Sequence, residues 1–183
     1  MRHGQTIQQV KRKDWTYPPF PEKPPIKLTE KGEKQIKATA KSLKKAGIEL
    51  IFSSDFFRTR QTAGIVAKEL GIRVRFDKRL RDGNLGIYRG GKKKKFYRDF
   101  PLNSKKFFYQ RPFQGENWTD IQKRTVAFLK SLDKRYKGKT ILIISHKDPL
   151  WLLEGAVKNW SANKLLKIKM GDNDIKTGEF RKL

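Results

Sequence analysis

The chain contains two histidines, and both occupy positions where a predicted strand passes into a loop. His3 directly follows Arg2 near the start of the sequence, and His146 follows the apolar run over 140–144. Open α/β sheets bind their ligands at the ends of strands. An imidazole nitrogen can attack a phosphoryl group, and guanidinium groups hold its oxygens through paired hydrogen bonds. Together with Arg58, these residues indicate a site that binds and attacks a phosphate monoester, although either histidine taken alone would more often be structural.

Such a reaction also needs a carboxyl group that protonates the leaving alkoxide and later activates water. Asp82 is the first candidate, because it lies in the glycine-rich segment 79–86 that follows a predicted strand. Glu116 is the second candidate. The alternative for Asp82 is a purely structural role, since aspartate before glycine is a common turn pattern.

The composition restricts the chemistry that the chain can perform. None of the 183 residues is a cysteine, which excludes disulfides, thiolate metal sites and a cysteine nucleophile. Two histidines would hold zinc only with the help of carboxylates, and we expect no metal and no other cofactor. No apolar run approaches the roughly 18 residues of a membrane span, and the N-terminus lacks the apolar core of a signal peptide. We therefore expect a cytoplasmic protein that forms one domain over 1–183.

The formal net charge of +26, from 44 Lys and Arg against 18 Asp and Glu, favours anionic partners. Phosphorylated small molecules or proteins, nucleic acid and acidic membrane headgroups all fit this charge. The alternative is that most of the lysines are simply solvated, and we favour it because runs of charge are usually exposed faces. We expect a phosphorylated substrate, with nucleic acid as an alternative partner of the basic surface, and no membrane contact.

Strands and helices are predicted to alternate around these residues. Thr29 is a plausible N-cap for the first helix, and the polar cluster 53–55 is one for the second. Two strand–helix pairs in a row predict a parallel sheet. The predicted strands are 48–52, 72–76 and 140–145, and the predicted helices are 29–47, 53–70, one from about 117 and a final one from 149, followed by a tail from 168 that is a candidate edge strand.

Two further segments lack a clear period. Residues 7–27 are rich in proline and are predicted to form a loop that makes one wall of the site, the alternative being a disordered arm. Residues 83–115 contain the basic run 92–95 followed by closely spaced aromatic residues. Such a mixture can bind single-stranded nucleic acid. It can also form a helical cap whose aromatic side chains pack inward while the lysines stay solvated, and we favour this second interpretation.

Six short motifs along 1–155 resemble, in order and approximate spacing, those of the histidine phosphatase superfamily, the phosphoglycerate mutase-like group. Six motifs in order are far more specific than any one of them. The motifs are Arg2-His3-Gly4-Gln5-Thr6, Leu28-Thr29-Glu30-Lys31-Gly32, Ser54-Asp55-Phe56-Phe57-Arg58 with Gln61-Thr62-Ala63, Arg79-Leu80-Arg81-Asp82 with Gly86, Gly115-Glu116-Asn117, and Ser145-His146.

The resemblance implies a three-layer α/β/α sandwich with a mostly parallel sheet and a cap inserted at approximately 83–115. It also implies that His3 is the nucleophile that becomes phosphorylated. The remaining site residues are then Arg2, Arg58 and His146 for the phosphoryl group, Asp82 as acid and base, and Gln5 and Glu116 as further candidates for substrate binding.

The activity implied by the resemblance is that of a cofactor-independent phosphomonoesterase of the phosphatase branch. A phosphoglycerate mutase is less favoured, because the longer motifs of the glycolytic mutases are absent. An alternative from another class is a catalytically weakened member that binds nucleic acid or protein through its basic surface, and the extreme charge motivates it.

Four positions depart from the pattern of the family. Only Met1 precedes the first motif, where the family has an apolar strand, and we therefore expect the first strand to be truncated. Asp82 stands where the family usually has glutamate. Lys147 follows the second histidine in place of a frequent glycine and adds a cation there. Gln8 or Gln9 stands near the position of an asparagine that usually follows the first motif.

Overall fold

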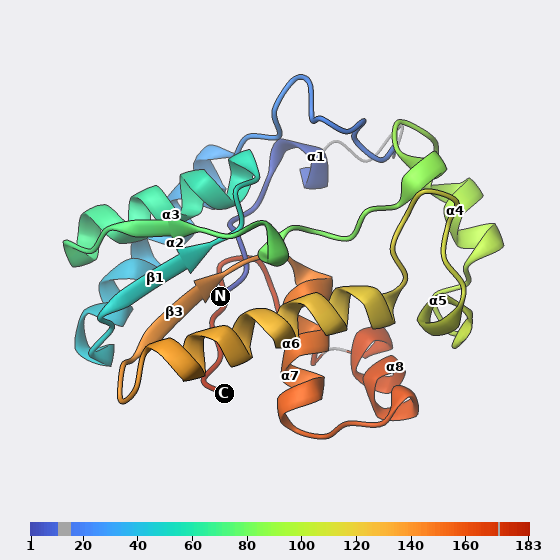
Figure 1. Cartoon of the computed structure of the whole chain (residues 1–183). Helices are drawn as coiled ribbons and strands as arrows, with labels where there is room; N and C mark the ends of the chain where they lie inside the picture. The colour runs from blue at the N-terminus through green and yellow to red at the C-terminus, as the bar shows by residue number, and fades with distance from the viewer. Residues whose placement is uncertain (11–15, 172) are drawn as a thin grey trace.

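The computed structural model of the chain describes residues 1–10, 16–171 and 173–183. Within them, three short strands form a parallel sheet in the order β2-β1-β3 (Figure 1). The strands are β1 (Leu50–Ser53), β2 (Val74–Phe76) and β3 (Ile141–Ile144). In the central strand, Ile51 pairs with Val74 on one side and with Leu142 on the other. The predicted parallel α/β fold is confirmed, although β1 and β2 begin later than predicted.

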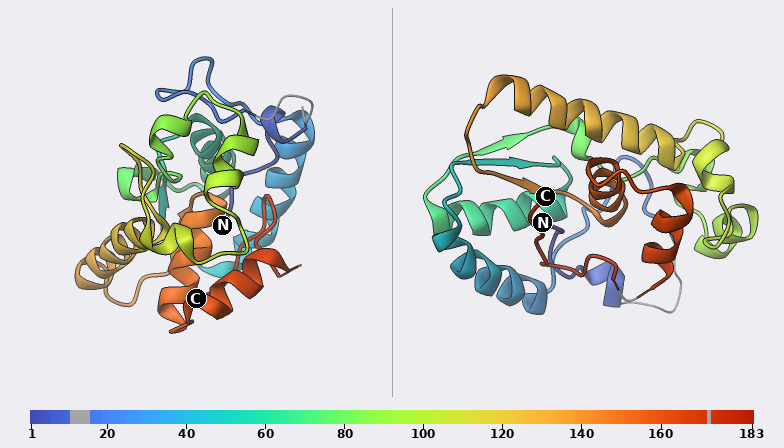
Figure 2. Two further views of the ribbon diagram at one scale, coloured as in Figure 1. Left: turned by 90° about the vertical axis from the view of Figure 1, so that its right-hand side faces the viewer. Right: turned by 90° about the horizontal axis from the view of Figure 1, so that it is seen from below.

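Helices cover both faces of the sheet and give the expected three layers (Figure 2). The helices on one face are α2 (Glu30–Leu43) and α3 (Phe57–Leu70), and the helix on the other is α6 (Trp118–Arg135). Successive side chains of a strand point to opposite faces. Accordingly, Leu142 packs in the core that includes Ile36 of α2, while Ile143 packs with Phe128 of α6.

The predicted start of α2 is confirmed. The Thr29 side chain accepts a hydrogen bond from Gly32 N, which satisfies one of the free donors of the first turn. The helix continues into a 3-10 turn over Lys44–Ala46 and stops at Gly47, whose φ of 64° suits glycine. Two other 3-10 turns are Lys78–Leu80 and Gly86–Tyr88.

The first residues of the chain run beside β3. Ser145 N donates to Met1 O at 3.0 Å, and His3 N donates to Ser145 O at 3.1 Å. On the opposite side, Arg2 N donates to Glu179 O at 2.9 Å. Arg2 and Ser145 form a parallel bridge, and the C-terminal segment lies on the other side of Arg2.

The C-terminal part differs from the prediction in two ways. α7 (Lys147–Val157) is not the last helix, because α8 (Ala162–Met170) follows it and includes the start of the tail that was a candidate edge strand. Further along the tail, Gly178 and Glu179 lie at the edge beside Arg2 through backbone hydrogen bonds, but they form no regular strand.

Ser161 begins α8 by accepting a hydrogen bond from Lys164 N. Leu165 packs so closely on α7 that a Cβ on Gly155 would lie 2.5 Å from it. Ala162, Leu166 and Ile168 of α8 are only partly buried against the same core cluster, and the lysines between them obscure the apolar period in the sequence.

The Pro-rich segment and the segment 83–115 lie at one end of the sheet. α1 (Ile7–Val10) is a single helical turn in the segment that was predicted to be a loop throughout, and 11–15 lie outside the described residues. The segment 83–115 holds two short helices beside the N-terminal end of α6 (Figure 1), namely α4 (Lys93–Asp99) and α5 (Lys106–Tyr109).

The aromatic residues of 83–115 mostly pack inward, in agreement with the favoured interpretation. One buried cluster contains Phe96, Phe100, Phe107, Phe108 and Trp118. The lysines at 94 and 95 are exposed. Among the described helices, none combines the length and the apolar character needed to span a bilayer.

Candidate active site

Four side chains that were predicted to act on a phosphoryl group meet where β1 and β3 end. Arg2 and His3 lie beside the end of β3, His146 follows β3, and Arg58 lies in the first turn of α3. Because neighbouring parallel strands end at the same edge, Ser54 after β1 reaches His146, with 2.9 Å between Oγ and Nε2. The ring centroids of His3 and His146 are 5.4 Å apart, at an interplanar angle of 63°.

The hydrogen bonds of His3 define which ring nitrogen is free to react. Nδ1 lies 2.8 Å from Gly4 O, and since a carbonyl oxygen only accepts, Nδ1 carries the proton. Nε2 therefore keeps its lone pair. Burial, followed by the nearby Arg58 and Arg2 guanidinium groups, lowers the pKa of His3 well below its usual value of 6.5. The imidazole is neutral at pH 7, the state that a nucleophile requires.

The glycine after His3 holds the loop against α2. Gly4 N donates to Thr62 Oγ1 of α3 at 3.2 Å. A Cβ at Gly4 would lie 2.8 Å from Ile36 Cγ1 and 2.9 Å from Gly32 O, and both distances are too short for real atoms. The first motif therefore requires glycine for close packing against α2.

His146 is fully buried and has one ring nitrogen unoccupied. Its Nε2 is paired with Ser54, while Nδ1 is buried, makes no hydrogen bond and lies 3.8 Å from Asp82 Oδ2. Burial, followed by the charges of Arg58 and the neighbouring His3, lowers the pKa of His146 well below 6.5. A buried polar atom without a partner is uncommon and marks a place for a ligand or water.

Arg58 is held between two carboxylates. Its Nη1 donates to Glu22 Oε1 at 2.6 Å, and its Nη2 donates to Asp82 Oδ2 at 3.2 Å. The side chains of Arg58 and Glu22 are only 7% and 8% exposed. The guanidinium carbon also lies 5.0 Å from the centre of the Phe56 ring. Sequence reasoning missed Glu22, because a glutamate among prolines carries no signal of a partner 36 residues away.

α3 (Phe57–Leu70) begins later than predicted, because the polar residues expected to cap it bond to other groups at the site. Its N-cap is Phe56, which makes no side-chain capping bond. The polar cluster predicted to cap the helix serves other groups: Ser54 pairs with His146, and both oxygens of Asp55 accept from Arg81 at 2.6 Å. Contacts at the strand ends thus take the place of local capping.

The two candidate acids occupy different surroundings. Asp82 Oδ2 faces Arg58 and His146, and the side chain is 39% exposed at the wall of the cavity. Glu116 instead accepts from Arg124 Nε at 2.8 Å and from Asn84 N at 2.9 Å. This geometry favours Asp82 over Glu116 as the proton donor, while Glu116 fixes the loop that carries Asp82.

Gln5 of the first motif and the two glutamines that follow it, Gln8 and Gln9, have different surroundings. Gln5, predicted to bind substrate, accepts from Thr29 Oγ1 at 2.9 Å and is absent from the lining of the cavity. Gln8 and Gln9 both line the cavity, and Gln9 Oε1 also accepts from Thr6 N at 2.9 Å. Gln8 and Gln9 therefore lie at the cavity wall, whereas Gln5 does not.

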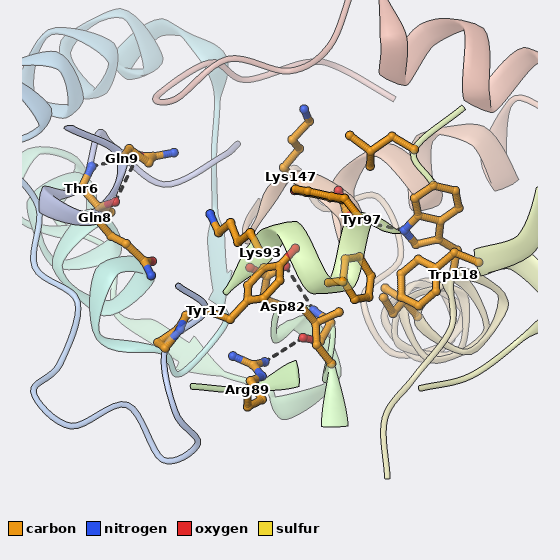
Figure 3. A pocket seen from close by; sticks show the side chains of 18 of the residues that line it. Thr6, Gln8, Gln9, Tyr17, Asp82, Arg89, Lys93, Tyr97, Trp118 and Lys147 are labelled. Carbon is orange, nitrogen blue, oxygen red and sulfur yellow. Dashed lines mark hydrogen bonds between the residues drawn. The ribbon is translucent and has the colours of Figure 1, made fainter. Parts of the chain in front are cut away.

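The cavity above these groups has a volume of about 340 Å³ and extends from His3 to the segment 83–115 (Figure 3). Tyr97 and Trp118 form part of its far wall, and Lys93, Arg89 and Lys147 add positive charge. Lys147, the cation added after the second histidine, forms an ion pair with Asp174. Within 1–10, 16–171 and 173–183, no cluster of three or more His, Cys, Asp or Glu side chains is arranged to hold a metal ion.

The chain matches known proteins both in sequence and in structure. A family model described as histidine phosphatase superfamily (branch 1) matches residues 1–181. The chain is 30% identical over 178 residues to the probable phosphoglycerate mutase GpmB of Shigella boydii, covering 90% of this chain and 77% of that protein. It is 31% identical over 156 residues to the Escherichia coli protein of the same name, covering 80% and 67%.

Solved structures have the same fold. The structure of Bacillus stearothermophilus YhfR has a TM-score of 0.74 and 29% identity, and the match covers 90% of this chain and 80% of that one. The complex of mycobacterial glucosyl-3-phosphoglycerate phosphatase Rv2419c with inorganic phosphate has a TM-score of 0.73 and 23% identity, covering 91% and 80%.

Proposed function

The chain belongs to the histidine phosphatase superfamily, and on this premise we propose that it is a phosphomonoester hydrolase that acts through a phosphohistidine on His3. One observation carries the proposal. His3 is neutral and donates from Nδ1 to Gly4 O, so that the Nε2 lone pair is available beside two guanidinium groups. This is the arrangement that a nucleophile needs to attack a phosphoryl dianion.

In the first step, Arg2, Arg58 and the free Nδ1 of His146 hold the phosphoryl oxygens. The Nε2 lone pair of His3 forms a bond to phosphorus, and the bond from phosphorus to the ester oxygen breaks. The electron pair leaves on that oxygen, which takes a proton from the carboxylic acid of Asp82. The products are a free alcohol and phosphohistidine.

In the second step, the Asp82 carboxylate takes a proton from water as the water oxygen attacks phosphorus. The bond from phosphorus to Nε2 breaks and its electron pair returns to His3. Inorganic phosphate leaves and Asp82 is again protonated. Asp82 suits both steps because it lies at the wall of the cavity that His3 also lines and is partly open to water.

The proposal also covers the division of the chain into a domain and a cap. We infer one domain over 1–183 in which approximately 83–115 form the cap that selects the substrate. The lining of the cavity supports this inference, since it combines His3 and Arg58 from the sheet edge with Lys93, Tyr97 and Phe107 from that segment.

The experiment that tests the function compares wild type and His3→Ala on a panel of phosphate esters. We expect His3→Ala to lose activity by several orders of magnitude and to lose an acid-labile phosphoryl label at the same time. Thermal melting of both proteins checks that the variant is folded. Activity within about tenfold of wild type would remove His3 as the nucleophile.

A phosphoglycerate mutase is the second candidate, favoured by the name of the curated relatives at 30% and 31% identity. A mutase returns the phosphoryl group of the phosphoenzyme to an acceptor alcohol, whereas a phosphatase gives it to water. Incubation with 3-phosphoglycerate, followed by measurement of 2-phosphoglycerate and inorganic phosphate, separates the two. We expect release of phosphate to exceed isomerisation, and the reverse result would establish the mutase.

A further inference from the structure

The segment 174–179, C-terminal to α8, runs beside the residues that begin the candidate active site. Gly178 N donates to the backbone oxygens of Arg2 and His3 at 3.2 and 3.1 Å. The same segment contacts α2, where Thr39 Oγ1 donates to Gly178 O at 3.1 Å. The first motif is therefore held between β3 and a segment that lies far from it in the sequence.

The Arg2 guanidinium is oriented by a hydrogen bond to this segment. Its Nη1 donates to Ile175 O at 2.8 Å, while its Nε is buried without a hydrogen bond. Arg2 lines the cavity, and its Nη2 makes no hydrogen bond with the part of the chain that the structure describes. The position of Ile175 O therefore decides how Arg2 presents its remaining donors to a phosphoryl group.

Asp174, the residue before Ile175, joins this segment to α7. Its Oδ2 forms an ion pair with Lys147 Nζ, and the Asp174 side chain is only 11% exposed. Removal of Lys147 would thus leave a nearly buried carboxylate without its cation, which is strongly unfavourable. Asp174 also acts on Arg2: burial lowers the pKa of Arg2, and the Asp174 carboxylate is the strongest of the charges that oppose this effect.

The Lys147 side chain lines the cavity, but its ammonium group is paired with Asp174. Figure 3 shows the end of this side chain pointing away from Asp82 and Arg89. The cation that stands in place of the family's frequent glycine is therefore directed at the segment 174–179. This arrangement favours an indirect role over a contact between Lys147 and the phosphoryl group.

We propose that Lys147 and Asp174 are positioning residues, whose ion pair fixes the segment 174–179 to α7 and so keeps Ile175 O in place to orient Arg2. The contacts form one series, from α7 through Lys147 and Asp174 to Ile175 and Arg2. Lys147 serves the site through Arg2 and does not touch the substrate. This inference rests on the proposed role of Arg2 in holding the phosphoryl oxygens.

The first experiment measures the inhibition constant Ki of inorganic phosphate, and kcat/KM for p-nitrophenyl phosphate, in Lys147→Met and Asp174→Asn. We expect each substitution to raise Ki at least about fivefold and to lower kcat/KM at least about tenfold, because Arg2 loses its orientation. Thermal melting checks that both variants are folded. An unchanged Ki in either variant would overturn the proposal.

The direction of the change in Asp174→Asn distinguishes positioning from a direct effect of charge. Loss of a negative charge near an anion site, by itself, tightens the binding of phosphate. If Lys147 bound the phosphoryl group directly, Asp174→Asn would free its ammonium and lower Ki, whereas Lys147→Met would raise it. Opposite changes in the two variants would therefore overturn the proposal, which requires both to weaken binding.

The variant with both substitutions tests whether the two residues act as a unit. We expect its Ki to lie within about twofold of that of the weaker single variant, because one substitution already breaks the ion pair. Lys176→Met is the matched control, since Lys176 is an exposed lysine of the same segment and does not line the cavity. Multiplied effects in the double variant, or an equal effect of Lys176→Met, would contradict the positioning role.

Hydrogen exchange separates this inference from the proposed function, because it requires no turnover. The Gly178 amide, which donates to Arg2 O and His3 O, should exchange at least about fivefold faster in Lys147→Met and Asp174→Asn than in wild type, with the amides of β1 unchanged. This result supports the role of the ion pair even if no ester is hydrolysed. Unchanged exchange at Gly178, or equal acceleration in β1, would overturn it even if His3 is phosphorylated as proposed.

Discussion

The ends of β1 and β3 differ from the segment 83–115 in how their side chains are held. At the strand ends, buried polar groups are fixed by individual hydrogen bonds, such as His3 to Gly4 O and His146 to Ser54. In 83–115, aromatic rings pack against one another and against α6, and the polar groups face outward or into the cavity. Chemistry at the strand ends therefore depends on the direction of a few bonds, whereas the shape of the cavity depends on packing. Substitutions in the two regions should affect different measurements.

After His3→Ala, the largest effect is expected at Asp82. Asp82→Asn keeps the size of the side chain but removes the transferable proton, and general acid–base groups contribute roughly 10² to 10⁴-fold in rate. We expect kcat/KM, which reports the step that forms phosphohistidine, to fall by about that factor for esters with poor leaving groups, and by much less for p-nitrophenyl phosphate, whose leaving oxygen needs no proton. Asp133→Asn, on an exposed residue of α6, is the control. An equal loss for both kinds of ester would contradict the role as acid.

The second prediction concerns the aromatic cluster. Phe107 is 3% exposed, and its ring centre lies 5.2 Å from those of Phe96 and Phe100 and 5.1 Å from that of Trp118. Phe107→Ala should lower the free energy of unfolding by about 3–5 kcal/mol, measured by urea denaturation.

The matched control is Phe113→Ala, because Phe113 belongs to the same segment but is 69% exposed. We expect this substitution to change the free energy of unfolding by less than about 0.5 kcal/mol. Equal losses for the two variants would show that the aromatic cluster does not hold the segment in place.

A smaller effect is expected at Arg58. Arg58→Lys keeps the charge but loses the planar pair of donors, and hydrogen bonds to charged groups are worth about 1.5–3 kcal/mol. We expect kcat/KM to fall by about 10- to 100-fold, with little change in melting temperature. Arg60→Lys, two residues further along α3 and exposed, is the control. Unchanged kcat/KM in Arg58→Lys would place Arg58 outside the phosphoryl site.

The smallest effect is a dependence of stability on pH. The pKa values of His3 and His146 are lowered well below 6.5 by burial, so that below pH 6.5 the unfolded chain binds more protons than the folded one. Stability is therefore lost as pH falls from about 6.5 to 5, by up to about 1.4 kcal/mol per pH unit for each histidine. Carboxylates titrate mostly below this window.

His3→Asn tests this dependence, because the asparagine amide can still donate to Gly4 O but does not titrate. Urea denaturation at a series of pH values should give a slope lower by about 1.4 kcal/mol per pH unit than that of wild type. Identical slopes for the two proteins would mean that His3 is not kept neutral by the fold.

The inward packing of the aromatic rings in 83–115 also bears on the alternative that this segment binds nucleic acid. Stacking of bases requires exposed aromatic faces. Phe96, Phe100, Phe107 and Phe108 are buried, and only Tyr109 and Phe113 of that aromatic run are largely exposed, at 71% and 69%. The aromatic run therefore supports the packing of the cavity wall more than an extended stacking surface.

The sequence by itself determined the parts that depend on local pattern. The periods of apolar residues and the cap at Thr29 predicted α2, and apolar runs predicted all three strands. The two histidines and Arg58 were found because few residue types can bind and attack a phosphate. Local signals failed in α8, where lysines interrupt the apolar residues that pack on the core, and at the start of α3, where Ser54 and Asp55 were expected to cap the helix.

Tertiary structure decided which partner each polar group has. Glu22 with Arg58, Ser54 with His146 and Lys147 with Asp174 are contacts between segments far apart in the sequence. No periodic pattern encodes them, because they depend on how the ends of parallel strands and the following loops meet in space.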